Sequence, residues 1–273
     1  MENTIIFIYC LAEDFLKALG HKEDPQTKMY DAEVITFALV AAFFFHGNYE
    51  RTRLFFSDQN HFGYLLEKSR LNKRLLRIDH ELWLQILVLC RVLLQNGDFQ
   101  EYIVDSFPVP VCQNARITSC KLLRGKKFHG FCASKNIYFF GLKVHVLTLA
   151  NGFPVEVIFT PGAESDMRAF RRLNLDIGTG SIIYGDKAYT DYSYEDILGD
   201  VGITLCTHRK KNAKRQHSYQ LSHIQKYRRK RIETSFSSIA RLMPRWIHAV
   251  TMRGFELKVM LFVLAFALQY VME

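Results

Sequence analysis

Residues 101–109 have the sequence EYIVDSFPV, which has the pattern of a buried strand that carries an acidic residue. A short apolar run of β-prone side chains leads into one carboxylate, Asp105, and Pro108 soon follows. Apolar runs of this length are typical of buried strands, and the proline predicts that the regular strand ends or is distorted near it. A carboxylate at the end of a core strand is costly to bury unless a cation compensates its charge. A divalent metal ion is the simplest such cation.

A second stretch repeats this design. Residues 181–189, SIIYGDKAY, again run from apolar side chains into one aspartate, Asp186. A third acidic residue, Glu233, stands alone in a basic segment whose apolar residues have helical spacing. Three carboxylates on two strand ends and a helix can converge on hard cations such as Mg²⁺, and two such ions roughly 4 Å apart promote displacement at a phosphodiester. Asp105, Asp186 and Glu233 are therefore the candidate catalytic and metal-binding residues.

Two basic residues accompany these carboxylates. Lys187 directly follows Asp186, and Arg229 lies one helical turn before Glu233 on the same face. Both are candidates to neutralise the charge of a bound phosphate. A surface ion pair between Arg229 and Glu233 is the alternative, but it does not explain why the only acid of the tract lies beside the apolar face.

Composition bounds the class of protein. The chain has 273 residues, 49% of them hydrophobic, which suffices for one large domain or two smaller ones and argues against disorder. The formal net charge of +9 predicts a polyanionic partner, nucleic acid before a membrane surface, although a basic protein without such a partner is the alternative. Six cysteines without a C-x-x-C motif predict free thiols in a reducing compartment. The apolar segment 259–272 is expected to be a buried helix.

Residues 1–97 have helical patterns throughout. A long helix is expected from Ser69 to Leu94, with Asn96-Gly97 as its stop. Four cations fall on one face of this helix and are candidate DNA-binding residues: Arg70, Lys73, Arg74 and Arg77. With the shorter helix before it, this helix is expected to form a unit that resembles a helix-turn-helix and binds duplex DNA. A solvated basic face on an ordinary bundle helix is the equally weighted alternative.

From about residue 99 the pattern changes to strands. A β run over 137–149 and a second over 153–160 flank Asn151-Gly152, a strong turn signal, and predict a hairpin. A helix from Asp166, a strand over 181–184, a helix over 192–199 and a strand over 203–207 follow. This order predicts an α/β fold, a mixed sheet flanked by helices. Within the hairpin, Lys143 and His145 are either DNA contacts or ordinary sheet residues.

Two basic tracts interrupt the strands, and neither contains an acidic residue. The first runs from Arg116 to Lys135, and the second runs from Arg209 to Arg231 and is interleaved with Tyr219 and Tyr227. Tracts of this kind bind phosphates, and their aromatic side chains can stack on exposed bases. The second tract leads directly into Glu233, which favours a role in binding over a merely solvated face.

Four motifs together resemble the DDE transposases of bacterial insertion sequences: VDSFPVPVC, FGLKVH, YGDKAYTD and RRKRIETSF. The separations of the three acids, 81 and 47 residues, agree with that family, as do HGNYERTRLFF near the N-terminus and GFELKV near the C-terminus. The resemblance implies a ribonuclease H-like catalytic core in which Asp105, Asp186 and Glu233 bind two Mg²⁺ or Mn²⁺ ions. The motif around Glu233 departs from the family at two positions. Tyr227 lies one residue closer to Glu233 than the tyrosine of the family, and Ala240, beside Arg241, stands where the family has a basic residue.

The sequence thus predicts a helical DNA-binding domain over 1–97 and a catalytic domain over 98–273 with a basic insertion around 209–231. The expected activity is metal-dependent cleavage of insertion-sequence ends, followed by joining of the 3′-hydroxyl to target DNA. The expected partners are double-stranded DNA and a second copy of the chain in a synaptic homodimer, with no membrane, in the cytoplasm at the bacterial nucleoid. A catalytically silent, transposase-derived DNA-binding protein and a related ribonuclease H-like DNA nuclease are the alternatives.

Overall fold

The computed structural model describes residues 1–273 with the exception of 60, 95–99, 134, 211 and 273. Contacts divide the described residues into two compact units, one of Met1–Cys90 with Ile239–Glu273 and one of Arg91–Ser238. The expected helix stop at Asn96-Gly97 and the expected domain boundary after residue 97 lie outside the described residues. The functional division into 1–97 and 98–273 therefore stays a prediction.

The first unit consists of helices, which are α1 (Glu2–Ala18), α2 (Asp31–Phe44), α3 (Tyr49–Gln59), α4 (Lys68–Arg77), α5 (His80–Leu93) and α9 (Met252–Met272). Both α2 and α9 are apolar around most of their circumference and are largely buried, as expected for helices at the centre of a bundle. Among the described residues, α9 is the single helix long and apolar enough to cross a membrane. Of its most apolar 18-residue stretch, 67% is buried inside the structure.

The single long helix predicted from Ser69 to Leu94 is wrong. The chain forms α4 and α5 instead, because Ile78 takes an extended conformation between them. The Oδ1 atom of Asp79 accepts a hydrogen bond from the Glu81 amide at 3.2 Å. Asp79, which the sequence placed within one continuous helix, therefore satisfies a backbone amide at the start of α5.

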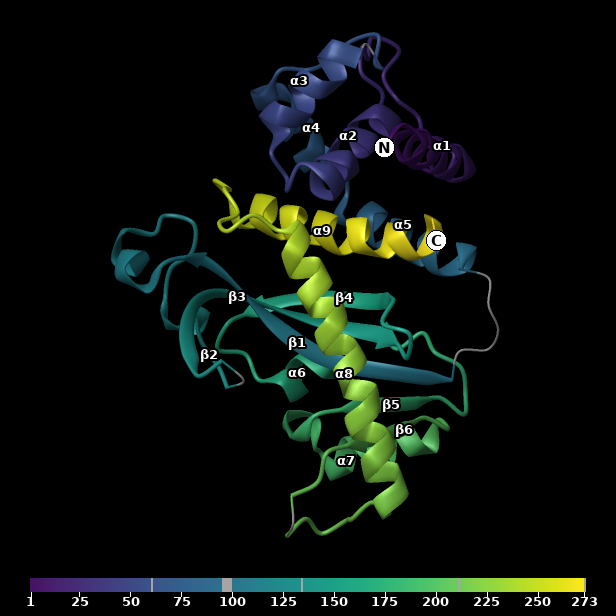
Figure 1. Cartoon of the computed structure of the whole chain (residues 1–273), viewed down its shortest axis with the longest axis vertical. Coiled ribbons are helices and arrows are strands. Elements are labelled where there is room, and N and C mark those ends of the chain that lie inside the picture. Colours follow the sequence, from purple (N-terminus) through teal and green to yellow (C-terminus); the bar gives the residue numbers. More distant parts are fainter. Residues whose placement is uncertain (60, 95–99, 134, 211, 273) are drawn as a thin grey trace. The chain divides into compact units, whose positions relative to one another are not determined.

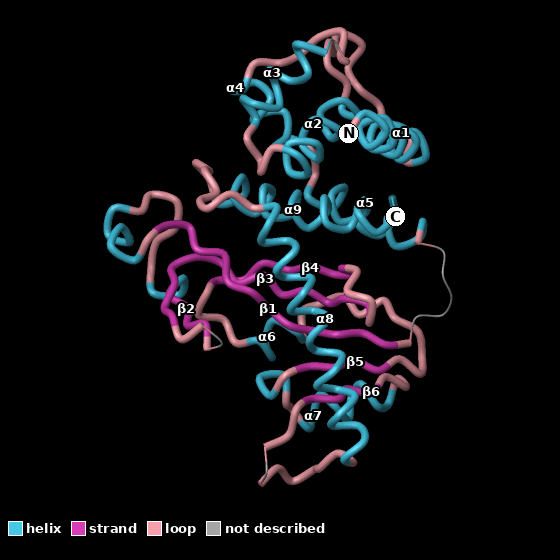
Figure 2. The backbone as a smooth tube through the Cα atoms, viewed as in Figure 1, coloured by secondary structure: helices cyan, strands magenta, loops and turns pink. Residues whose placement is uncertain are grey.

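The second unit is built on a mixed six-stranded sheet of β1 (Glu101–Cys112), β2 (His129–Cys132), β3 (Ile137–Leu149), β4 (Pro154–Pro161), β5 (Ile182–Gly185) and β6 (Thr204–Thr207). The strand order is β2-β3-β1-β5-β6, and β4 also pairs with β3. Strands β1, β5 and β6 are parallel, and β3 is antiparallel to β1. The strands are drawn in magenta in Figure 2. This arrangement confirms the mixed α/β prediction and agrees with the ribonuclease H-like sheet that the resemblance implied.

Three helices flank this sheet: α6 (Asp166–Phe170), α7 (Tyr192–Asp200) and α8 (Tyr219–Leu242). The long helix α8 crosses one face of the sheet (Figure 1). Ile232 of α8 is fully buried against Ile103, Tyr184 and Cys206 from the three parallel strands. The phenyl ring of Phe236, one turn later, lies 4.7 Å from that of Phe107. The apolar stripe predicted to face the sheet therefore does so at these two positions.

Strand β1 does not end at Asp105, as the sequence suggested. It continues through Pro108, which pairs with Lys143 of β3, to an irregularity between Pro110 and Cys112. The proline is tolerated because β5 pairs with β1 only as far as Ile103, so the missing N–H of Pro108 leaves no ladder bond unmade on that side. Asp105 consequently lies inside β1, just beyond the point where its parallel neighbour stops.

Candidate active site

Asp105 points toward helix α8. Side chains alternate across a strand, so Asp105 shares the sheet face of Ile103 and Phe107, both of which contact α8. Its Oδ1 atom accepts a hydrogen bond from the Ser106 amide at 2.8 Å, and its Oδ2 atom lies 3.7 Å from a guanidinium nitrogen of Arg229. The side chain is 19% exposed, which leaves the carboxylate accessible from one side.

Asp186 lies beside Asp105 in the register of the sheet. The parallel pairing matches Ile103 with Tyr184, and the same offset brings Asp105 level with Asp186 where the two strands separate. One Asp186 oxygen accepts a hydrogen bond from the Ala188 amide at 2.6 Å, which holds the side chain at the end of β5. Lys187 is exposed beside it. The two aspartates predicted from similar stretches thus come together on neighbouring strands.

The electrostatics of Asp105 support this proximity. Burial raises the pKa of the Asp105 carboxyl from 3.8 to about 6, and the negative charges of Asp186 and Asp166 act in the same direction. The Ser106 amide and the Arg229 guanidinium oppose the shift without overcoming it. A divalent cation would compensate the charge of these two neighbouring carboxylates. Aspartate oxygens are also ligands that Mg²⁺ prefers.

Glu233 stands on α8 one turn after Arg229 and next to the buried Ile232. Its side chain is exposed. Among the described residues, the group of potential metal ligands with atoms within 4.8 Å of one another is His21, Glu23 and Asp31. The two aspartates and Glu233 do not form such a tight group. The ion pair between Arg229 and Asp105 brings the relevant face of α8 to the sheet, and a metal site shared by Glu233 stays a prediction.

A fourth carboxylate, Asp166, reaches β1 from the opposite face of the sheet. Its Oδ1 atom accepts a hydrogen bond from the Ser106 hydroxyl at 2.8 Å and lies 3.3 Å from the Lys143 ammonium group. Sequence reasoning treated Asp166 as a helix cap, whereas Ser165 caps α6. Only the pairing of β1 with β3 brings Ser106 and Lys143 to the same side of the sheet, so local sequence carried no signal for this cluster.

His145 is a core residue of the sheet. It is fully buried, its Nε2 atom lies 2.9 Å from the Thr160 hydroxyl, and its Nδ1 atom lies 3.7 Å from Asp166. Burial lowers the pKa of the His145 imidazole to about 4, although Asp166 acts against that shift. The ring is therefore neutral at physiological pH and has no exposed edge to present to a phosphate. Of the two readings of His145, the structure favours the sheet residue.

Gln225 is a site residue that the sequence did not reveal. It is buried, and its side-chain amide donates hydrogen bonds to the carbonyl oxygens of Gly185 at 2.8 Å and Cys206 at 3.1 Å. These contacts tie α8 to the end of β5, immediately before Asp186, and to the end of β6. Gln225, Arg229 and Glu233 follow at intervals of four residues, so the same bonds set which face of α8 is presented to the aspartates.

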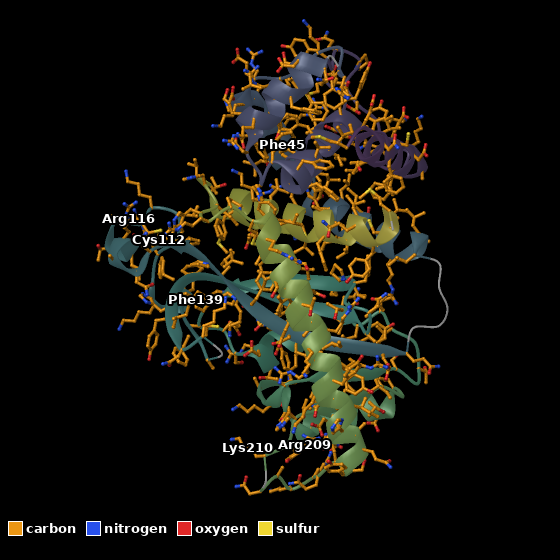
Figure 3. All side chains as sticks on the ribbon, in the orientation of Figure 1. Phe45, Cys112, Arg116, Phe139, Arg209 and Lys210 are labelled. Atoms are coloured by element: carbon orange, nitrogen blue, oxygen red, sulfur yellow. The ribbon has the colours of Figure 1, made fainter. Side chains whose placement is uncertain are left out.

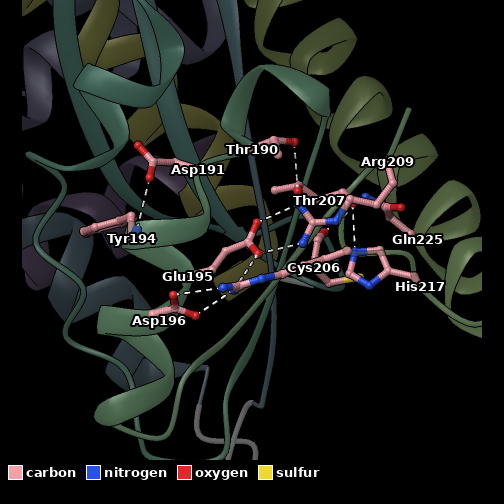
Figure 4. Close-up of polar contacts among 11 residues, drawn as sticks. Thr190, Asp191, Tyr194, Glu195, Asp196, Cys206, Thr207, Arg209, His217 and Gln225 are labelled. Carbon is pink, nitrogen blue, oxygen red and sulfur yellow. Dashed lines mark hydrogen bonds and ion pairs between the residues drawn. The ribbon is translucent and has the colours of Figure 1, made fainter. Parts of the chain in front are cut away.

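Four arginines of the second basic tract are paired with acids from elsewhere in its unit. Arg209 forms two hydrogen bonds of 2.7 Å with Glu195, a pair in which the side chains are 5% and 9% exposed. Arg215 pairs with Asp196, and both arginines lie over the Tyr192 ring. Figure 4 shows the contacts between Arg209 and Glu195. Further along the tract, Arg228 pairs with Glu101, and Arg229 pairs with Asp105. Much of this tract therefore fastens α8 and the preceding loop to the sheet.

The four cations of α4 also differ from one another. Arg70, Lys73 and Arg77 are exposed. Arg74 instead forms ion pairs with Glu23 at 3.0 Å and Asp31 at 2.9 Å. Because this guanidinium already holds the loop before α2 against α4, the DNA-binding role predicted for Arg74 would compete with its internal pairs.

Comparison with known proteins gives one match. Residues 98–246, more than half of the chain, match the family model described as "Transposase DDE domain". No curated protein and no solved structure matches the chain. The matched segment contains the whole sheet and all three of the predicted acids.

Proposed function

The chain belongs to the DDE transposases, and we propose that it cleaves the ends of a bacterial insertion sequence and joins the freed 3′-hydroxyl to target DNA. The observation that supports this proposal is that Asp105 of β1 and Asp186, which directly follows β5, come to neighbouring positions when the parallel register is continued, while burial and acidic neighbours raise the pKa of Asp105. Such a pair has the charge and the oxygen ligands to hold divalent cations.

We assign Asp105, Asp186 and Glu233 as the ligands of two Mg²⁺ or Mn²⁺ ions. Cations bound there would activate the attacking oxygen and stabilise the leaving oxygen of the phosphodiester. Ser106 and Ala188 hold the two aspartates through their backbone amides. These bonds place the carboxylates before DNA arrives, so less free energy is spent on ordering them during the reaction.

Arg229 and Lys187 are assigned to the phosphate that reacts. Arg229 lies against Asp105 and its side chain is 29% exposed, so part of its guanidinium is accessible to a phosphate. Lys187 is exposed beside Asp186. Positive groups at these positions would offset the charge that develops on the non-bridging oxygens during in-line displacement.

Duplex DNA is the proposed partner of the helical unit. The exposed cations Arg70, Lys73 and Arg77 support contact between α4 and the phosphates of an element end. A homodimer in the synaptic complex would bring two ends together, in the cytoplasm at the nucleoid. The rival proposal of a catalytically silent DNA-binding protein is disfavoured by the presence of all three acids.

The test is cleavage of DNA that carries the gene of this chain with its natural flanking sequence. The Glu233→Gln variant removes the charge that a divalent ion requires while keeping the shape of the side chain. We expect it to abolish cleavage and joining and to bind the ends without metal as the wild type does. Asp200→Asn, a charge-matched change at an exposed residue of α7, is the control and should cleave normally.

Cleavage by Glu233→Gln at the wild-type rate in ordinary Mg²⁺ would remove Glu233 from the site. End binding without cleavage by the wild type, under all metal conditions, would favour the silent DNA-binding protein.

A further inference from the structure

The two basic tracts look alike in the sequence but differ in the structure. Acids and carbonyl groups of the same unit engage arginines along the second tract. The six cations of the first tract are all exposed, and none of them forms an ion pair with a described residue: Arg116, Lys121, Arg124, Lys126, Lys127 and Lys135. Figure 3 shows Arg116 on the loop that projects beyond the end of β1. Uncompensated positive charge is therefore concentrated around the β2–β3 hairpin.

An exposed pair of aromatic rings lies on this hairpin. Phe131 of β2 pairs directly with Tyr138 of β3, and their ring centroids are 4.8 Å apart. The side chains are 46% and 74% exposed, and the neighbouring Ile137 is also exposed. On the other face of the hairpin, Phe139 and Phe128 are buried. Because side chains alternate across each strand, Phe131 and Tyr138 are exposed on one face of the hairpin while its other face is packed.

The chemistry of this surface indicates its ligand. Exposed aromatic side chains on a positively charged surface stack on nucleic-acid bases while the cations contact the phosphates. In a duplex the faces of the bases are covered by their neighbours and only their edges are accessible in the grooves. A ring pair presented in this way therefore suits a strand whose bases are unpaired.

We propose that the β2–β3 hairpin and the loop before it form a binding site for unpaired DNA, with Phe131 and Tyr138 as the stacking surface. The proposal deepens the transposase function and rests on it, because strand cleavage and joining are reactions that expose single strands. The proposed binding site is separate from the candidate active site. Asp105 pairs with Val146 of β3, and the eight residues from Val146 to Tyr138 span about 26 Å. The rings are therefore too far from Asp105 to take part in metal binding.

The test measures binding of a fluorescently labelled twelve-nucleotide oligo(dT) by anisotropy in EDTA, with the full chain. The double variant Phe131→Ala/Tyr138→Ala should weaken binding by roughly fivefold to a hundredfold for each base that stacks. Its unfolding midpoint should stay at the wild-type value, because the rings lie in solvent. Tyr138→Phe keeps the ring and should bind normally. Ile197→Ala, which removes an exposed apolar side chain from α7 of the same unit, is the control and should also bind normally.

A second arm tests the cations. Lys126→Ala/Lys127→Ala should reduce the slope of log affinity against log salt by about 1.4, the value for two contacts with a single strand. Wild-type affinity of the aromatic double variant for oligo(dT) would overturn the proposal. So would an equal loss for oligo(dT) and for duplex DNA, or preferential binding of the surface to phosphatidylserine vesicles. Because no metal is present, failure of strand cleavage would bear on the proposed function and leave this result unaffected.

Discussion

Replacing Asp105 with asparagine should make the protein more stable while removing its activity. The Asp105→Asn side chain keeps an oxygen that can accept the Ser106 amide hydrogen bond. It removes a charge that lies in a largely buried position near Asp186 and Asp166. Active sites commonly hold charged groups at a cost in stability, and the raised pKa of Asp105 gives that cost a magnitude.

The pKa of Asp105 rises from 3.8 to about 6 on folding. Each pKa unit corresponds to about 1.4 kcal/mol, so the ionised carboxylate lowers the free energy of unfolding by about 3 kcal/mol at most. Below pH 3.8 the group is neutral in both states and this cost is absent. It grows as the pH rises through 6 and is complete above it. The variant should therefore match the wild type near pH 4 and exceed its stability most at pH 8.

The measurement is urea denaturation of both proteins at several pH values in EDTA. Circular dichroism is the appropriate signal, because both tryptophans, Trp83 and Trp246, belong to the other unit. Asp200→Asn is again the control and should show no pH-dependent gain. Addition of Mg²⁺ should stabilise the wild type and not the Asp105→Asn variant, because a ligand that binds only the folded state raises its stability.

A stability difference that does not vary between pH 4 and pH 8 would refute this reasoning. So would an Asp105→Asn variant less stable than the wild type at pH 8. Either result would mean that the carboxylate is well solvated or fully compensated by Arg229, and the electrostatic support for a metal site at Asp105 would be lost.

Three further changes test the other contacts. Arg74→Ala should lower the free energy of unfolding in the same urea titration by about 2 kcal/mol, because it removes the guanidinium that Glu23 and Asp31 share and leaves Asp31 with His21. Lys73→Ala should instead weaken DNA binding at unchanged stability. Gln225→Leu removes the hydrogen-bond donor to two buried carbonyl oxygens and should lower the free energy of unfolding by about 1–3 kcal/mol. It should also slow cleavage while end binding is retained. Normal cleavage would show that these bonds do not position α8. Arg209→Met should cost about 3–5 kcal/mol by leaving the buried Glu195 with the longer contact of 3.9 Å to Arg215, and calorimetry that finds a loss below 1 kcal/mol would contradict the buried pair.

The sequence alone predicted the mixed sheet of the second unit and the proximity of two candidate site residues. Apolar runs and a turn signal predicted the strands, because hydrophobic alternation is a local property of the chain. The similar stretches around Asp105 and Asp186 pointed to neighbouring strands, and the parallel register bears that out. Helical spacing predicted the face that α8 turns to the sheet, and Ile232 and Phe236 lie there.

The compensation of charge could not be predicted from the sequence and is visible in the folded chain. Whether a cation is available to DNA depends on acids distant in the sequence: Glu195 holds Arg209, and Glu23 holds Arg74, while the first basic tract meets no such partner among the described residues. The approach of Asp166 to Ser106 likewise depends on strand pairing across forty residues of chain. The physical reason is that hydrophobic periodicity acts over a few residues, whereas an ion pair or a buried hydrogen bond requires the chain to be folded before its partner is known.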